Sequence, residues 1–313
     1  MGSNFSFLLY DPCACSLLFG DPDDLRSKVF AASSECSSQP STPNLGDLPE
    51  NCAALVLAYL DPLEICKLAR INRAFRSASW ADFVWDSKLP SNYEALVERL
   101  LCDSNSNAEL SRKMGKREIF AFLSQTKTFD AGTKRAWVDK KTGGLCLSIS
   151  AKGLTITGID DRRYWNHIPT EESRFGSIAY LRQIWWFEVG GQMEFPFPAG
   201  TYSIFFRIQL GRAAKSFGRR ICNTEHVHGW DIKPVRFQLW TSDGQHVSSQ
   251  YVFEEAGKWA LYHVGDFTVD GSKPTTKVQL SVTQIDCTHT KGGLCLDSVI
   301  VCPCTYQDKS KVF

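Results

Sequence analysis

Hydrophobic positions recur with two different spacings along the chain. Between Leu48 and about Phe122 they lie three or four residues apart, which is typical of helices that bury one face. After Phe129 they alternate with polar residues, as in strands whose two faces meet different surroundings. The pattern predicts a helical region followed by an antiparallel β-sandwich over residues 131–305, and therefore an α+β chain with more than one domain.

The segment TYSIFFRIQL, residues 201–210, shows the strand pattern most clearly. Tyr202, Ile204, Phe206, Ile208 and Leu210 fall on one face, and polar residues fall on the other except at Phe205. This alternation predicts a half-buried strand. Trp185 and Trp186 also alternate between strand faces, so at least one of these two side chains is expected in the core.

Two short helices joined at Asp61-Pro62 are expected to open the helical region. Pro62 suits a first helical turn, and Asp61 with Glu64 has the spacing of a capping box. The apolar positions of both helices form faces that are wider than the single stripe of an ordinary surface helix. Three short helices of about fifty residues cannot easily bury all of this surface among themselves. The excess predicts a partner, either the sandwich of the same chain or a second protein.

Composition excludes several classes of function. The 313 residues carry a net charge of +1, which gives no field that favours nucleic acid or an anionic membrane. The longest apolar runs fall short of the roughly 18 residues of a membrane helix, so no transmembrane segment is expected. Without a secretory leader the chain is expected in the cytoplasm and nucleus, with its 12 cysteines reduced.

Residues 1–43 have the composition of a flexible tail that ends in a Ser- and Pro-rich stretch. Gly2 and Ser6 match the N-myristoylation pattern, and one acyl chain would support only weak membrane association. The alternative is an unmodified tail. Residues 306–313 are expected to form a short C-terminal tail.

No motif for catalysis or for a cofactor occurs in the sequence. His226, His228, Cys287, His289 and the Cys302-Pro-Cys304 stretch could be combined into a zinc site, but they lack the paired spacing of structural zinc sites. We therefore expect no metal and no cofactor. Carboxylate pairs such as Asp160 with Glu171 are too common to indicate a glycosidase.

One loop-like segment, GLTITGIDDRRYWNHIPTEESRF at residues 153–175, places aromatic side chains among charged ones. An aromatic ring stacks on the apolar face of a sugar, and neighbouring donors and acceptors hydrogen-bond its hydroxyls. The segment is therefore a candidate carbohydrate site. The alternative is that Trp165 belongs to the core and that the charges form salt bridges in a loop.

The helical segment LPENCAALVLAYLDPLEICKLARINRAFRSASWADFVWDSKLP resembles an F-box, which we assign to residues 44–95, with a helical linker over 96–130. The resemblance implies docking on a Skp-type adaptor, which joins F-box proteins to a cullin and a RING subunit. The residues that it assigns to adaptor binding are Leu48, Pro49, Leu55, Leu60, Leu63, Ile65, Leu68, Ile71, Phe75 and Trp85.

The strand segments RAWVDKKTGGLCLSISAKGLTITGIDDRRYWNHI, AYLRQIWWFEVGGQM, GWDIKPVRFQLW and GGLCLDSVIVCP resemble the phloem lectins, the Nictaba-like domains of plants. The resemblance implies a jelly-roll-like, carbohydrate-binding β-sandwich. Gly158 stands where the tobacco lectin has a second tryptophan, and His167 stands where it has another. The residues assigned to sugar binding are Arg163, Tyr164, Trp165, Asn166 and His167.

Together the two resemblances imply a non-catalytic receptor subunit of a ubiquitin ligase, with a glycan or glycoprotein as its target. Two alternatives remain open at this point. One is a lectin whose helices pack internally and recruit no ligase, and the other is a glycan hydrolase.

Overall fold

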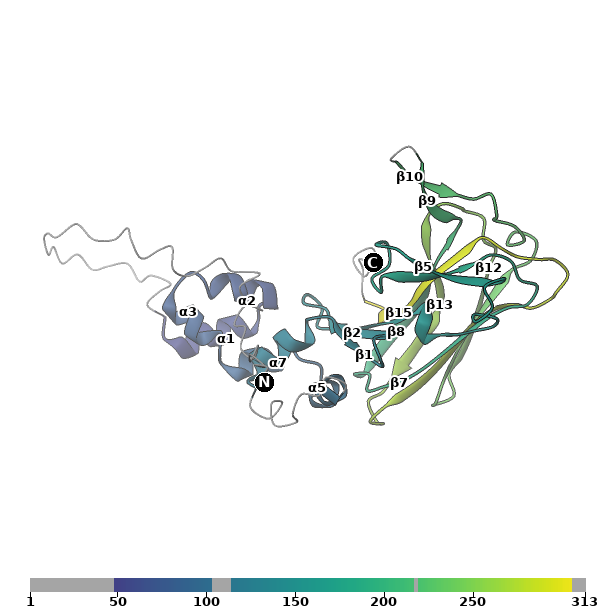
Figure 1. The fold of residues 1–313 in the computed structure, drawn as a ribbon. Helices are drawn as coiled ribbons and strands as arrows, with labels where there is room; N and C mark the ends of the chain where they lie inside the picture. Colours follow the sequence, from purple (N-terminus) through teal and green to yellow (C-terminus); the bar gives the residue numbers. More distant parts are fainter. Residues whose placement is uncertain (1–47, 103–113, 217–218, 306–313) are drawn as a thin grey trace, which may run out of the picture.

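The computed structural model describes residues 48–102, 114–216 and 219–305 of the chain. Figure 1 shows a helical region and a β-rich region side by side, with α1, α2 and α3 at the end farthest from the sheets. The helices are α1 (Glu50–Ala58), α2 (Pro62–Leu68), α3 (Arg73–Ala78), α4 (Asp82–Asp86), α5 (Tyr93–Cys102) and α7 (Lys116–Leu123). Gly2 and the tails lie outside the described residues, so the lipidation site stays a prediction.

The N-termini of α2 and α3 differ in their capping. Pro62 occupies the first turn of α2 as expected, but the side chain of Asp61 accepts no capping hydrogen bond. Glu64 pairs with Lys67 instead, with 2.7 Å between Oε1 and Nζ, so the expected capping box is absent. The side chain of Asn72 caps α3 by accepting a hydrogen bond from the Phe75 backbone N–H at 2.9 Å.

The helices share a small core. Ala53, Leu57, Ile65 and Phe75 are buried where α1, α2 and α3 meet. Trp85 of α4 continues this core toward α7, because its ring centroid lies 5.2 Å from that of Phe120 and its indole Nε1 donates to the Ser79 carbonyl. The buried residues of the helices are continuous with the apolar core of the β-rich region.

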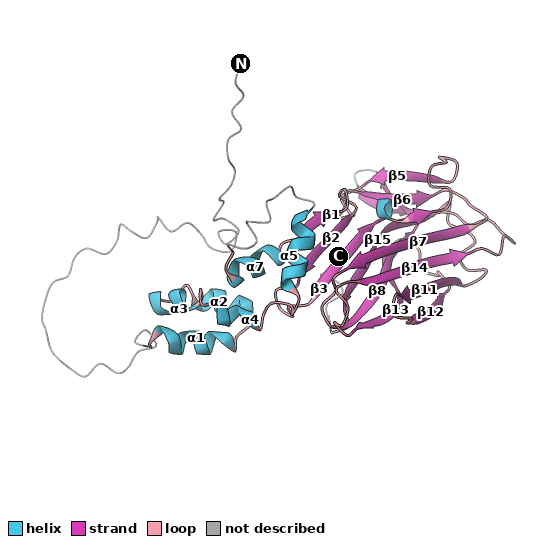
Figure 2. Ribbon diagram, turned by 90° about the horizontal axis from the view of Figure 1, so that it is seen from below, coloured by secondary structure: helices cyan, strands magenta, loops and turns pink. Residues whose placement is uncertain are grey.

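Two large antiparallel sheets and a two-stranded ribbon, β9 with β10, form the described part of the β-rich region (Figure 2). One large sheet has eight strands in the order β1-β2-β3-β15-β6-β5, with β8 paired to β15 and β13 paired to β8, and the other has the order β12-β11-β14-β7-β4. Their facing sides share one apolar core. The strands are β1 (Lys127–Phe129), β2 (Lys134–Val138), β3 (Leu145–Ser150), β4 (Thr155–Ile156), β5 (Trp165–Pro169), β6 (Ser177–Leu181), β7 (Phe187–Phe195), β8 (Gly200–Leu210), β9 (Arg212–Ser216), β10 (Arg219–Asn223), β11 (Val235–Thr241), β12 (His246–Tyr251), β13 (Trp259–Val269), β14 (Thr276–Gln284) and β15 (Leu294–Pro303).

The predicted order of helices and then antiparallel strands is confirmed, but β8 is not the half-buried strand that its alternation predicts. Its polar residues Ser203 and Gln209 are only 5% exposed, and Phe205 is 4% exposed. Phe205 belongs to a second apolar cluster on the outer face of the eight-stranded sheet, with Cys146, Ile300 and Cys302. The strand is therefore buried on both faces.

The helical and β-rich regions are fastened together near Asp130. Its carboxylate accepts from Arg99 of α5 at 2.6 Å and from Lys134 of β2 at 2.7 Å. The Arg99 guanidinium also lies 5.0 Å from the centre of the Phe129 ring. The first strand, β1, begins four residues before the expected start of the sandwich at residue 131. Of the described helices, none has the length and apolar character needed to span a bilayer.

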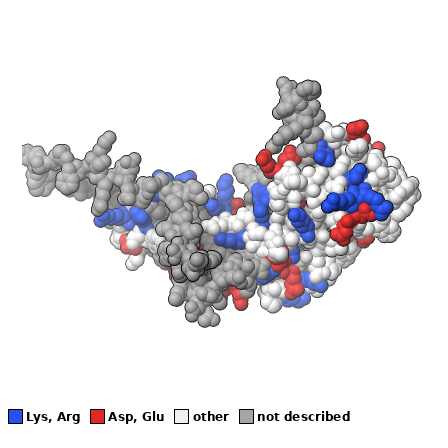
Figure 3. Space-filling model, in the orientation of Figure 1, with Lys and Arg blue, Asp and Glu red and all other residues white. Residues whose placement is uncertain are grey.

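The surface of the β-rich region carries both signs of charge. Figure 3 shows acidic and basic side chains close to one another over the visible face, rather than one large region of a single sign. This distribution agrees with the net charge of +1.

We predict that Asp130→Asn weakens the connection between the two regions in a pH-dependent way. Burial would raise the pKa of Asp130, but the hydrogen bonds from Lys134 and Arg99 outweigh it and hold the pKa below the ordinary value of 3.8. The ionised form therefore stabilises the fold above the ordinary pKa, and this contribution disappears as the pH falls through the lowered pKa.

The expected difference in unfolding free energy between the wild type and Asp130→Asn is about 1 kcal/mol at pH 7, since these side chains are partly exposed. Urea unfolding at several pH values measures it. The difference should shrink below about pH 4. A difference that stays constant from neutral to acidic pH would contradict the assignment.

Candidate adaptor and glycan-binding sites

The first candidate site is an apolar face on α1 and the turns around it, which we call the adaptor face. Leu55 is 58% exposed, Tyr59 is 90% exposed and Ile71 is 63% exposed. Leu48 and Val56 are also exposed. Large apolar side chains that gather in water mark an interaction surface rather than a finished interior.

The ten predicted adaptor residues divide into three groups by burial. Leu48, Pro49, Leu55 and Ile71 are exposed, and Leu60, Leu63 and Leu68 are half-buried. The remaining three are core residues with at most 2% exposure: Ile65, Phe75 and Trp85.

The burial of Ile65, Phe75 and Trp85 corrects their assignment as contact residues, because a buried side chain shapes the docking face without reaching a partner. Sequence reasoning missed Val56 and Tyr59, which continue the exposed face of α1 next to Leu55. The sequence could have indicated Tyr59, because residues four apart lie on the same helix face and Tyr59 follows Leu55 by four. Val56 is the next residue after Leu55.

The second candidate site is the predicted sugar loop before β5. Arg163 is bound to Asp161, with its Nη2 2.7 Å from Oδ2 and its Nε 3.0 Å from the same oxygen. These hydrogen bonds lower the pKa of Asp161. Arg163 also lies over the exposed Tyr164 ring, 5.6 Å from its centre. Arg163 and Tyr164 therefore form one surface, held in place by Asp161.

Trp165 is not part of that surface. Its indole is 1% exposed, donates from Nε1 to the Thr157 carbonyl at 3.1 Å, and stacks on Phe187 with 6.4 Å between ring centres. This is the alternative in which the tryptophan belongs to the core, and the buried ring offers no face to a sugar. The predicted stacking residue is thus a structural one.

Asn166 and His167 follow on β5. Asn166 is half-buried and His167 is exposed. Partial desolvation, with the nearby charge of Lys152, lowers the pKa of His167, so the ring is neutral at pH 7. Sugar binding by the exposed members of this set stays a prediction.

Gly158 explains why a second tryptophan is absent from the loop. Its φ is +78°, a conformation that residues with a side chain rarely adopt. A Cβ placed there would lie 3.3 Å from Cδ2 of Tyr164. A tryptophan at this position therefore requires a different loop conformation.

Trp185 and Trp186, of which at least one was expected in the core, are 53% and 44% exposed. Trp186 donates from Nε1 to the Glu188 carboxylate at 2.8 Å, and the buried Lys291 donates to the Trp185 carbonyl at 2.6 Å. The expectation was wrong because these residues precede β7 rather than lie within it. They place exposed aromatic rings beside the predicted sugar loop, since the Glu188 carbonyl accepts from Thr157.

The cysteine and histidine residues that were considered for a zinc site do not form a metal-binding cluster within the described ranges. His289 is hydrogen-bonded to the Gly229 carbonyl, and His228 to the Thr290 hydroxyl. Both rings are thus engaged in the turn that leads to β15.

Comparisons with known proteins agree with both halves of this architecture. An F-box domain model matches residues 45–86, and a model of phloem protein 2 matches residues 144–303. F-box protein PP2-A12 of Arabidopsis thaliana is 60% identical over 291 residues, which cover 93% of this chain and 98% of the relative. F-box protein PP2-A11 of the same plant is 56% identical over 99% of each chain.

The chain belongs to the F-box proteins that carry a phloem protein 2 domain. Its helical region is an F-box module, and its β-sandwich is a lectin-like phloem protein 2 (PP2) domain. A third relative, F-box protein PP2-A15 of Arabidopsis thaliana, is 52% identical over 83% of this chain and 89% of that relative.

Solved structures resemble the PP2 domain only weakly. A family 35 carbohydrate-binding module from Clostridium thermocellum gives a TM-score of 0.30 at 12% identity, over 50% of this chain and 96% of that chain. TmCBM61 in complex with beta-1,4-galactotriose gives 0.28 at 14% identity, over 47% of this chain and 85% of that chain.

We predict that Trp165→Ala destabilises the PP2 domain by about 3–5 kcal/mol, because it removes a buried ring and leaves a cavity. Tyr164→Ala, a change at the neighbouring exposed ring, is expected to cost less than about 1 kcal/mol. Urea unfolding of the two variants measures the contrast. Equal and small losses would show that Trp165 is not a core residue.

Proposed function

We propose that the chain is the substrate-recognition subunit of an SCF-type cullin-RING ubiquitin ligase. The F-box module binds a Skp-type adaptor, and through it a cullin and a RING subunit. The PP2 domain binds a glycan or a glycoprotein target. The adaptor face of α1 is the observation that carries this proposal.

The adaptor face has the character of an interface that lacks its partner. Leu55, Tyr59 and Ile71 expose most of their side chains although each could be buried by a second protein. Burying apolar surface is worth roughly 25 cal/mol per Å². Tyr59 is a suitable anchor, because aromatic residues near the centre of an interface contribute much of its binding energy.

The sandwich leaves this face accessible. In the part of the chain that the structure describes, α5 and α7 make the most extensive helix contacts with the strands of the β-rich region. Asn92 lies just before α5, and its side-chain Nδ2 donates to the Pro196 carbonyl at 2.9 Å. Internal packing of the helices against the sandwich therefore uses the opposite end of the module.

In this function the chain acts by positioning and needs no catalytic residue. The two regions are joined at Asp130, so a target bound to the PP2 domain is held at a restricted distance from the adaptor face. Restricting that distance raises the effective concentration of target lysines near the ubiquitin-carrying enzyme. The other subunits of the ligase carry out the transfer of ubiquitin.

We predict that Ile71→Arg reduces the affinity for the Skp-type adaptor at least about tenfold, because it places a charge in the centre of an apolar interface. The matched control is Ile232→Arg, the same change at a residue of the PP2 domain that is 59% exposed against 63% for Ile71. Co-purification and titration calorimetry with the recombinant adaptor measure both variants.

Neither substitution should alter the unfolding temperature by much, since both side chains lie in water. The proposal fails if the wild-type chain does not bind the adaptor. It also fails if Ile71→Arg and Ile232→Arg bind equally well, because the adaptor face would then not be the docking surface.

A further inference from the structure

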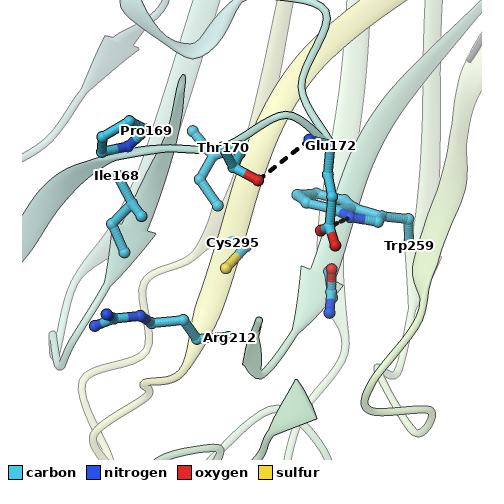
Figure 4. A pocket seen from close by; sticks show the side chains of 9 residues that line it. Ile168, Pro169, Thr170, Glu172, Arg212, Trp259 and Cys295 are labelled. Atoms are coloured by element: carbon cyan, nitrogen blue, oxygen red, sulfur yellow. Dashed lines mark hydrogen bonds between the residues drawn. The ribbon is translucent and has the colours of Figure 1, made fainter. Parts of the chain in front are cut away.

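A shallow hollow of about 60 Å³ lies on the outer face of the eight-stranded sheet (Figure 4). It uses residues 168–172, at the end of the candidate sugar segment 153–175, but not Arg163 or Tyr164 of the loop before β5. The turn that joins β5 to β6 closes one side of it, and the rest of the wall comes from β5, β6, β8, β9, β13 and β15. The polar and aromatic residues that line it are Thr170, Glu172, Gln209, Arg212 and Trp259, around the thiol of Cys295.

Glu172 is fixed in the wall of this hollow by three contacts. Its backbone N–H donates to the Thr170 hydroxyl at 3.2 Å, and its carbonyl accepts from Arg207 at 3.0 Å. Its Oε2 accepts from the Trp259 indole at 3.0 Å, which leaves Oε1 as an acceptor toward the hollow. A wall held in one conformation loses little entropy when a ligand binds.

A buried ion pair supports this arrangement from below. Arg207 Nη1 lies 2.9 Å from Oδ2 of Asp297, which is 2% exposed, and the guanidinium lies 4.2 Å from the centre of the Trp259 ring. Oδ1 of Asp297 has no hydrogen-bond partner among the described residues. Through Arg207 this pair reaches both the Glu172 carbonyl and the Trp259 ring, so it holds two residues of the wall in place.

The hollow combines opposite charges with an apolar floor. Arg212 is exposed, lies 5.8 Å from the centre of the Tyr180 ring and forms no ion pair within the described part of the chain. Glu172 stands on the opposite side in Figure 4. The floor is neutral, because burial raises the pKa of the Cys295 thiol to about 12.

We propose that this hollow is the glycan-binding site of the PP2 domain and that it takes one neutral hexose residue at the end of a glycan. This inference rests on the proposed function. Carboxylate, amide and guanidinium groups together supply the acceptors and donors that a ring of hydroxyls needs. The hollow is much smaller than the pockets of about 300 Å³ or more that enclose a whole ligand, so it would contact one side of a single terminal sugar residue rather than a longer chain.

A charged sugar fits the hollow less well than a neutral one. The carboxylate of a uronic acid would be attracted by Arg212 and repelled by Glu172, and it would lose its hydration without a matched partner. The apolar side chains of Ile168 and Ile178, which also line the hollow, suit the carbon face of the ring. Neutral hexoses are therefore preferred.

The test begins with the full-length wild-type chain on a glycan array, followed by titration with free hexoses and with glucuronate. The matched variants are Arg212→Ala in the hollow and Arg163→Ala in the predicted sugar loop, each the removal of one exposed guanidinium. A third variant, Ile168→Phe, fills the hollow with a larger side chain. Thermal unfolding confirms that each variant remains folded.

We expect the wild type to bind a hexose with a dissociation constant on the order of a millimolar. Arg212→Ala and Ile168→Phe should each weaken this binding at least about tenfold, and Arg163→Ala should change it less than about twofold. Glucuronate should bind more weakly than glucose. This pattern would support the hollow as the site.

Two other outcomes would overturn the inference, and they separate it from the proposed function. If Arg163→Ala abolishes glycan binding while Arg212→Ala and Ile168→Phe bind like the wild type, the glycan lies at the loop and the proposed function stands. If the wild type binds no glycan at all, the glycan part of the proposed function fails together with the hollow.

Discussion

An apolar face that the F-box module leaves in water is the constraint on which the rest of the architecture depends. The described helices bury an interior that runs from Phe75 and Ile65 through Trp85 to Phe120 of α7. Of these helices, α5 and α7 make the most extensive contacts with the sandwich, at the far end of this interior. Leu55, Tyr59 and Ile71 are left exposed by the described residues, and an exposed apolar face of this kind is typical of an interaction surface.

The regular parts of this fold could be predicted from the sequence, because they follow from local spacing. The helical period, Pro62 at the start of α2 and the alternation of the later strands each reflect contacts within one element. The burial of β8 could not be predicted in this way. Its outer face is covered at Phe205 by side chains of β3 and β15 and at Arg207 by the Glu172 carbonyl of the turn at 170–176, and nothing in residues 200–210 records where those segments fold. The missing capping box of α2 is a similar case, since Lys67 pairs with the Glu64 carboxylate that the spacing assigned to the box.

The candidate sites show the same division. Membership of the family, and with it the adaptor face, follows from the order of hydrophobic residues in the F-box. The spacing cannot tell Leu55, which is exposed, from Phe75, which is buried, because both are apolar residues at helical intervals. The spacing leaves Trp165 open between the core and a sugar site, and the structure places it in the core. The spacing also puts at least one of Trp185 and Trp186 in the core, whereas both are about half exposed. The hollow beside Trp259 joins residues 170, 209, 212 and 259, which are too far apart in the chain for any local pattern to connect them.

The most direct measurement of the central claim is hydrogen–deuterium exchange of the full-length chain with and without the Skp-type adaptor. The account predicts slower exchange over α1 and the turn at Ile71 when the adaptor is bound, with the sheets of the PP2 domain unchanged. A stable complex whose protected peptides lie in the sandwich, or no complex at all, would contradict it.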